Sequence, residues 1–355
     1  MYEKNRLMKV MPIVKHYALE PHFVEEIGNV QRIYTNKGIF ALKKINPKQG
    51  ADFIRHVQTL FQNGYNRIVP IFPTVDGRYA VLHNNELYYL MPWLANEEKE
   101  NRFARHQQLF RELARLHTLS VREVKIEKDE RKEHYENTIQ EWEKETEFLE
   151  GFIEACEQRV YMSPFELSFA LYYNEVNQAL RYSSNKLKEW YEKTKDNDKA
   201  RTVIVHGKVS TEHFLYDDRG YGYFINFENA KQGSPLHDLL PFLSRTLKTH
   251  PKRSEECIEW IYTYLNHFPF KEDEFLLFLS YFAHPGSIIR SAEKYYKSPK
   301  RLSERKATYH LHRQYWLFKN TEYVVMRIEE IEQQKKQAKE AEAQTQTQKG
   351  AQSQS

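Results

Sequence analysis

The stretch Thr202–Leu243 constrains the fold most strongly, because a strand, a turn and polar residues follow one another there in an order that implies a site. Val203–Val205 is a β-branched apolar run, which predicts a short buried strand. The strand ends at His206-Gly207, where the chain has to turn. Because a buried strand leads directly into a polar loop here, we predict a functional site at the loop that begins with His206.

A β-hairpin is predicted directly after the loop. Apolar runs at Leu215-Tyr216 and Tyr223–Ile225 flank Asp217–Gly220, whose composition is typical of a hairpin turn. Asn226 and Glu228 then follow the second strand. The sequence therefore predicts that these two polar side chains project from the end of the hairpin.

This layout resembles the aminoglycoside phosphotransferase and choline kinase-like families. Their motif His-Gly-Asp-x-x-x-x-Asn, followed by a hairpin ending in Ile-Asp-Phe or Ile-Asp-Trp and a further acid, reads here as His206-Gly207-Lys208, His213 and Ile225–Glu228. The resemblance covers roughly Val24–Asn320. It implies an α+β fold that is bilobal and protein-kinase-like, with a small β-rich N-lobe and a large helical C-lobe.

Three positions of the family motif carry altered chemistry. In the family, the first Asp accepts the substrate proton, and the Asn and second Asp hold magnesium. Lys208 stands at the base position and, when protonated, can only donate. His213 and Asn226 stand at metal positions, although magnesium prefers anionic oxygen, so Glu228 is the remaining charged ligand. The resemblance thus implies a pseudokinase with no metal site.

Other interpretations of these residues stay open. A small-molecule ATP-dependent phosphotransferase with a rearranged active site is the main alternative. A metal site from His206, His213 and Glu228 has no supporting ligand-spacing motif. Lys208 is expected either to pair with Glu228 and close the pocket, or to replace the metal electrostatically with help from Lys43. In the second case, residual ATP binding would be weak and independent of magnesium.

Two antiparallel strands are predicted at Val30–Thr35 and Gly38–Ile45, joined by a tight turn. Lys43 on the second strand resembles the lysine that contacts nucleotide phosphates in kinase-like folds, and Gly28-Asn29 takes the position of the preceding loop. The alternative is a solvated strand lysine. Lys43, Gly28 and Asn29 are therefore candidate phosphate contacts.

Further elements complete the predicted N-lobe. A helix is expected over Gln49–Asn63, and strands are expected over Ile68–Ile71, Tyr79–His83 and Glu86–Met91. The segment Tyr88–Leu94 resembles the hinge that meets an adenine ring, although an ordinary apolar strand end fits as well.

The C-lobe is predicted to begin with a helix over Asn101–Leu119, in which His117 is expected to be a packed core histidine. Asp238, in a Pro-x-x-Asp-Leu element, is expected to fix the catalytic loop, and His206 is likewise assigned a structural role. Further helices are predicted over Glu127–Cys156, Pro164–Tyr191, Glu255–Asn266, Glu272–Phe282, Ile288–Tyr296 and Ser303–Glu332.

The length of 355 residues allows a sizeable core and predicts two lobes. We predict an N-lobe over residues 1–93, a helical C-lobe over 94–332 with the altered catalytic segment at 203–241, and a polar tail over 333–355 that is disordered or only partly helical.

Composition excludes several classes of protein. Charged residues make up 29% of the chain and no long apolar run occurs, which predicts a soluble protein without a transmembrane helix. No secretory signal is evident, and the two cysteines lack metal-like spacing. The net charge of +4 is interleaved with acids, so nucleic acid is not expected as a partner.

Within the superfamily, Arg111–His117 (RELARLH), the charged helical insert and the altered motif at 206–213 are most similar to the endospore coat-associated kinase-like proteins of the CotS, YsxE and YutH type, with YutH nearest. This resemblance implies synthesis in the mother-cell cytoplasm followed by location in the endospore coat. It also implies other coat proteins as partners, a role in coat structure or assembly, and no required cofactor.

Overall fold

The computed structural model describes residues 2–49, 52–94, 96, 102–297 and 303–352. The chain forms two units, each assembled from separate stretches of sequence. The first unit contains residues 1–123, 201–242 and 263–268, and the second contains 124–200, 243–262 and 269–355. The predicted boundary at residue 93 is therefore not the boundary of these units, because the first unit also takes in the next helix and the catalytic segment.

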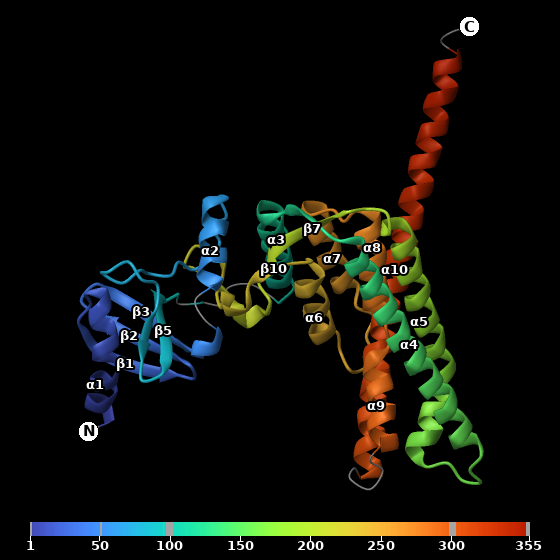
Figure 1. Ribbon diagram of the computed structural model, residues 1–355, viewed down its shortest axis with the longest axis horizontal. Helices are drawn as coiled ribbons and strands as arrows, with labels where there is room; N and C mark the ends of the chain where they lie inside the picture. The colour runs from blue at the N-terminus through green and yellow to red at the C-terminus, as the bar shows by residue number, and fades with distance from the viewer. Residues whose placement is uncertain (1, 50–51, 95, 97–101, 298–302, 353–355) are drawn as a thin grey trace. The chain divides into compact units, whose positions relative to one another are not determined.

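The first unit contains an antiparallel sheet in the order β1-β2-β3-β5-β4 (Figure 1). Its strands are β1 (Pro21–Ile27), β2 (Val30–Thr35), β3 (Gly38–Ile45), β4 (Val81–His83) and β5 (Glu86–Pro92). The predicted bounds of β2 and β3 are confirmed. The predicted strand at Ile68–Ile71 is wrong, because Ile68 makes only an isolated bridge to Phe224.

An N-terminal helix, α1 (Tyr2–Val14), packs against one face of this sheet and was not predicted from the sequence. It is followed by the short helix η1 (Lys15–Tyr17). The shared core is formed by Val10, Ile13, Val14, Tyr17, Leu19, Val24, Ile33, Leu42, Val81 and Leu90. Because side chains alternate along a strand, Lys43 and Tyr89, the neighbours of Leu42 and Leu90, face the opposite side of the sheet.

The first unit also contains further helices and strands. They are η2 (Pro47–Gln49), α2 (Phe53–Gln62), α3 (Arg102–Ser120), the start of β6 (Arg122–Lys125), most of β7 (Lys199–Val205), η3 (Thr211–His213), β8 (Phe214–Tyr216), β9 (Gly222–Phe224), η4 (Phe227–Asn229), β10 (Lys231–Gly233) and the start of α6 (Leu236–Thr246). The hairpin prediction is confirmed, since β8 and β9 pair antiparallel. Strand β7 pairs antiparallel with β10. Asn101, the predicted start of α3, lies outside the described residues.

Helices build the second unit. They are α4 (Lys128–Glu157), α5 (Pro164–Thr194), most of α7 (Glu255–His267), α8 (Glu272–Ala283), α9 (Gly286–Lys297) and α10 (Glu304–Gln352). The start of α5 shows why the sequence folds this way, because Ser163 and Glu166 form a reciprocal capping box and Pro164 occupies the first turn. The core between these helices is apolar and rich in aromatic rings, including Trp142, Phe165 and Phe169.

The polar tail was expected to be disordered or only partly helical from residue 333, and helix α10 continues through it to Gln352. Gln, Ala, Lys and Glu dominate this stretch and have high helix propensity, which accounts for the helical backbone. Residues 333–341 are all exposed, so this part of the helix buries no apolar face.

The predicted α+β class is confirmed by the N-terminal antiparallel sheet and the predominantly helical remainder of the chain. Within the described ranges, we find no helix with the length and apolar character needed to cross a bilayer.

Candidate functional site

The loop after β7 is held by a buried carboxylate. Asp238 near the start of α6 is 1% exposed and accepts hydrogen bonds from the backbone N–H groups of His206 (2.7 Å) and Gly207 (2.8 Å). His117 donates from Nε2 to the same carboxylate (3.2 Å), and Tyr264 donates its hydroxyl to His117 Nδ1 (2.7 Å). Burial raises the pKa of Asp238, but the donors from His117 and His206 outweigh it and hold the pKa below its usual value.

His206 links the loop to the hairpin. Its Nε2 must carry the proton, because its partner at 2.7 Å is the backbone carbonyl of Ile225, which can only accept. Its Nδ1 accepts the backbone N–H of Lys208 (3.2 Å). Both ring nitrogens are therefore satisfied in the neutral form. Burial lowers the pKa of His206, in agreement with this arrangement.

We expect the free energy of unfolding to decrease as the pH falls from about 7 to about 5. Burial lowers the pKa values of His56, His134, His206 and His213 in the folded chain. Below the ordinary histidine pKa, the unfolded chain therefore binds more protons than the folded chain, and acid favours unfolding. Urea denaturation at a series of pH values tests this expectation. Constant or rising stability toward pH 5 would contradict it.

Lys43 lies between two side chains that follow the hairpin. Its Nζ donates to Asn226 Oδ1 and to Glu228 Oε1, each at 2.5 Å. Tyr89 donates its hydroxyl to the same Glu228 oxygen, also at 2.5 Å. The Lys43 and Glu228 side chains are only 12% and 7% exposed, so this is a nearly buried ion pair.

The protonation of this pair follows from its donors. Burial lowers the pKa of the Lys43 amine, and the opposing effect of Glu228 does not cancel it. Burial also raises the pKa of Glu228, but Lys43 and Tyr89 outweigh this effect and hold that pKa below its ordinary value. The lowered pKa of Lys43 favours the neutral amine, whereas the lowered pKa of Glu228 favours the carboxylate, with the proton on Lys43. We describe the pair as ammonium and carboxylate, because two donors converge on one Glu228 oxygen and two acceptors face Lys43 Nζ.

The hairpin positions Asn226 through a backbone conformation that few residues adopt. Asn226 has φ 69° and ψ 51°, in the left-handed region that Asn tolerates better than most residues. The preceding residue, Ile225, donates its backbone N–H to the His213 carbonyl (3.0 Å). The chain then turns into η4, which carries Glu228. The local sequence therefore brings Asn226 and Glu228 to the same ammonium group.

Lys208 does not pair with Glu228, and that prediction is wrong. Glu228 is occupied by Lys43 and Tyr89, whereas the Lys208 side chain is exposed and has no ion pair among the described residues. The Lys208 carbonyl accepts the Nδ1 proton of His213 (2.8 Å), which leaves His213 Nε2 as an acceptor. Burial lowers the pKa of His213, and the charges of Lys208 and Lys43 lower it further.

The structure does not support the predicted alternative of a metal site from His206, His213 and Glu228. Both ring nitrogens of His206 are engaged in hydrogen bonds, and the inward oxygen of Glu228 has two donors. Across the part of the chain that the structure describes, no group of three or more His, Cys, Asp or Glu side chains could hold a metal ion.

The other predicted contacts lie on the sheet. Gly28 and Asn29 form the turn between β1 and β2, and the Asn29 carbonyl accepts the backbone N–H of Lys44 (3.2 Å). The Gly28-Asn29 turn thus lies beside β3, but the residues that Lys43 Nζ hydrogen-bonds in the described part of the chain are Asn226 and Glu228. The predicted hinge begins in β5, whose last residue, Pro92, pairs with Phe40.

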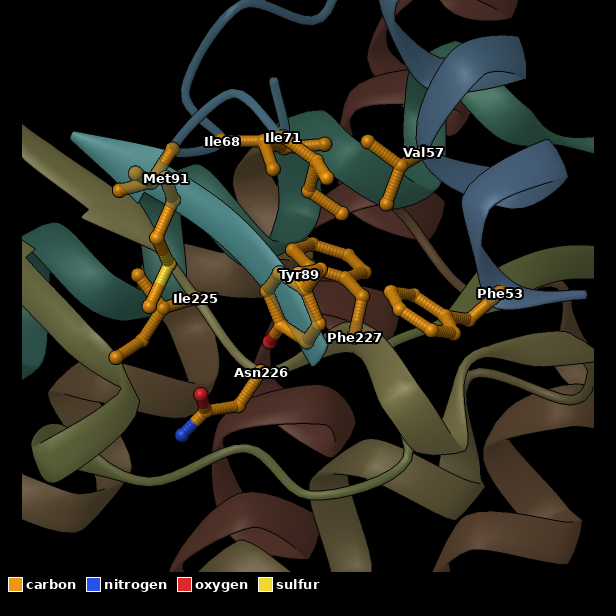
Figure 2. A pocket seen from close by; sticks show the side chains of 10 residues that line it. Phe53, Val57, Ile68, Ile71, Tyr89, Met91, Ile225, Asn226 and Phe227 are labelled. Atoms are coloured by element: carbon orange, nitrogen blue, oxygen red, sulfur yellow. The ribbon is translucent and has the colours of Figure 1, made fainter. Parts of the chain in front are cut away.

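Behind the Lys43 group lies a small apolar pocket with room for about one water molecule. Its lining consists of Phe53, Val57, Ile68, Val69, Ile71, Tyr89, Met91, Ile225, Asn226 and Phe227. Figure 2 shows the rings of Phe53, Tyr89 and Phe227 close to one another, with the Asn226 amide pointing away from them. The pocket is therefore lined by side chains of α2 and β5 together with the Ile225–Phe227 segment, which includes the Lys43 acceptor Asn226.

Tyr89 is the site residue that the sequence analysis missed. It lies directly opposite Lys43 in the antiparallel β3–β5 register. Burial raises the pKa of its hydroxyl well above the ordinary value, so Tyr89 stays a donor to Glu228. The alternation of side chains along the strand indicates which face of the sheet Lys43 occupies. Identifying Tyr89 as its neighbour also requires the register between β3 and β5, which the sequence does not give.

A family model described as "Phosphotransferase enzyme family" matches residues 27–268, which is more than half of the chain. No curated protein matches the sequence significantly.

Two solved structures illustrate the likeness in fold. The aminoglycoside phosphotransferase from Alicyclobacillus acidocaldarius is 16% identical with a TM-score of 0.62, over 88% of this chain and 96% of that chain. Spectinomycin phosphotransferase APH(9)-Ia, in complex with ADP and spectinomycin, is 10% identical with a TM-score of 0.51, over 90% of this chain and 98% of that chain. At these identities the likeness concerns the fold alone.

Proposed function

Because the chain belongs to the phosphotransferase enzyme family, we propose that it is a catalytically degenerate member that keeps the kinase-like fold without carrying out phosphoryl transfer. The observation that carries this proposal is the base position. Lys208 stands there with an exposed side chain that can only donate while protonated, so it cannot accept a hydroxyl proton.

Neighbouring carboxylates do not supply the missing base. Glu228 is occupied by Lys43 and Tyr89. Asp238 is buried and accepts from the loop backbone and His117. Both oxygens of Asp238 accept hydrogen bonds, and the two donors on Oε1 of Glu228 hold the pKa of that carboxyl below its ordinary value, which weakens it as a base. The residues that hold the loop together are therefore poor replacements for the lost catalytic Asp.

The donor set also does not fit magnesium, which the family uses against the phosphates. Magnesium demands octahedral oxygen coordination and usually at least one free carboxylate. Asn226 supplies a neutral amide oxygen that already accepts from Lys43, and His213 supplies a nitrogen. We therefore propose that the protein requires no cofactor. Any nucleotide binding should be weak, indifferent to magnesium, and weaker still at high salt.

We further propose that the protein acts in the structure or assembly of the bacterial endospore coat, with other coat proteins as its partners. The support is the resemblance of its altered motif and charged helical insert to endospore coat-associated kinase-like proteins. The protein would be made in the mother-cell cytoplasm and then deposited on the coat. A fluorescent fusion expressed in a sporulating host should form a ring around the forespore. A signal that stays diffuse in the mother cell would contradict this role.

One observation favours a second candidate, an ATP-dependent small-molecule phosphotransferase with a rearranged site. Nε2 of His213 is an acceptor without a hydrogen-bond partner among the described residues, and the lowered pKa of His213 keeps the ring neutral near pH 7. A neutral imidazole can serve as a general base.

Turnover separates the two candidates. With ATP, magnesium and a panel of aminoglycosides and choline, we expect neither ATP hydrolysis nor phosphoryl transfer above the buffer background, because both the base and the metal ligands are altered. The matched variants Lys208→Ala and Glu228→Gln should give the same background. Magnesium-dependent turnover that is lost in His213→Gln would overturn the degenerate assignment and establish the rearranged site.

A further inference from the structure

The Lys43 ammonium occupies the point where a metal would be expected to meet its ligands. Asn226 and Glu228 follow the hairpin at the positions where the family carries magnesium ligands or a further acid. In this chain, the Oδ1 of Asn226 and the Oε1 of Glu228 both accept from Lys43 Nζ at 2.5 Å. A single protein cation therefore already satisfies both oxygens.

The surroundings stabilise Lys43 in this position. Tyr89, opposite Lys43 in the β3–β5 register, adds a second donor to the same Glu228 oxygen. The side chains of Lys43 and Glu228 are nearly buried, so solvent screens their attraction poorly. A divalent cation could reach the Oε1 of Glu228 only by displacing a nearly buried ammonium group and a tyrosine hydroxyl. Four side chains therefore meet at this contact, Lys43 from β3, Tyr89 from β5, and Asn226 and Glu228 from the segment after the hairpin.

We propose that Lys43 is a permanent internal substitute for the divalent cation, so that the site excludes magnesium and suits a phosphate-bearing anion without its metal. The Lys43 and Glu228 charges cancel, which leaves the exposed ammonium of Lys208 to attract the anion. Lys208 has no ion pair within the described ranges, so its charge is available to a ligand. This inference rests on the proposed loss of phosphoryl transfer, but metal binding tests it separately from turnover.

Manganese titration followed by electron paramagnetic resonance tests the substitution directly, with Mn²⁺ as the probe for magnesium. The full chain should bind no Mn²⁺ at this site. The variant Lys43→Met, alone or combined with Asn226→Asp, should gain one Mn²⁺ per chain, because Glu228 loses its ammonium partner. The matched control is Lys44→Met, which removes the neighbouring strand lysine that pairs with exposed Glu86 and should gain nothing.

Two results would overturn the substitution. One is a Mn²⁺ site in the unaltered chain that disappears in Glu228→Gln. The other is a folded Lys43→Met variant that gains no Mn²⁺. If Lys43→Met is too unstable in buffer for the titration, its melting temperature measured over a range of magnesium concentrations provides the second measurement. The melting temperature should rise with magnesium concentration in Lys43→Met and stay constant in the unaltered chain, since a ligand of the folded state stabilises it.

Calorimetry with ADP tests the ligand class. Equal affinity in magnesium and in chelator, lost in Lys208→Ala, is the expected result. Binding that requires magnesium would overturn the whole inference. Absence of binding in both buffers would overturn the anion site, while the manganese titration would still decide whether Lys43 replaces the metal. None of these outcomes depends on turnover, so each can fail while the proposed loss of phosphoryl transfer stands.

Discussion

Replacing Asp238 with Ala should destabilise the chain by about 3–5 kcal/mol, because three donors, two of them in buried hydrogen bonds, lose their acceptor at once. Two of those donors are the backbone N–H groups of His206 and Gly207, so the loop itself would lose its anchor. Urea denaturation monitored by circular dichroism measures the effect. Asp238→Asn should be intermediate, since an amide keeps one acceptor oxygen but lacks the charge.

Lys208→Ala is the matched control for this prediction. Its side chain is exposed in the same loop, so truncation should change stability by no more than about 0.5 kcal/mol. Equal denaturation midpoints for Asp238→Ala, Lys208→Ala and the parent would show that the Asp238 carboxylate does not hold the loop.

Gly207→Ala should also cost about 3–4 kcal/mol, through steric overlap as well as backbone strain. Gly207 has φ +78°, and a Cβ at this position would lie 2.9 Å from both the carbonyl carbon and the Cβ of Asn229, and closer still to its carbonyl oxygen. The backbone of η4 would have to move, and with it the segment that carries Glu228. The loss should appear in thermal and urea unfolding.

The chain provides a control with the same backbone conformation. Gly220 has φ +81°, but a Cβ there would meet nothing within 4 Å. Gly220→Ala should therefore show only the cost of the left-handed conformation, about 1–2 kcal/mol. If both variants lost the same stability, close packing against Asn229 would not be the reason for glycine at position 207.

Sequence reasoning worked best where local patterns decide the structure. β2 and β3 were predicted with their observed bounds, because alternating apolar residues flank a short polar turn. Ile68–Ile71 has the composition of a strand, but in the folded chain its side chains line the small pocket. Its backbone makes a single isolated bridge, from Ile68 to Phe224. Helix α1 was missed because it contains Pro12 and buries only a narrow apolar face.

The candidate site was predicted in part. Motif spacing identified Lys208, His213, Asn226, Glu228 and Asp238 as candidate site residues. It could not identify the partner of Glu228, because Lys43 lies 185 positions away and competes with Lys208 only in the folded chain. The same holds for Tyr89, whose role depends on strand register. Long-range partner choice is a property of packing, and a single sequence carries little local trace of it.

The first unit is assembled from three separate stretches of the chain, and this limits how the protein can be divided into fragments. Residues 1–123 carry the sheet, but the hairpin and η4 come from 201–242, after the chain has passed through the second unit. No single cut between residues yields either unit complete. A fragment ending at residue 123 would contain Lys43 and Tyr89 without Asn226, Glu228 or Asp238, so Lys43 Nζ would lose both of its acceptors. Dividing the chain after residue 123 therefore leaves neither fragment with a complete site.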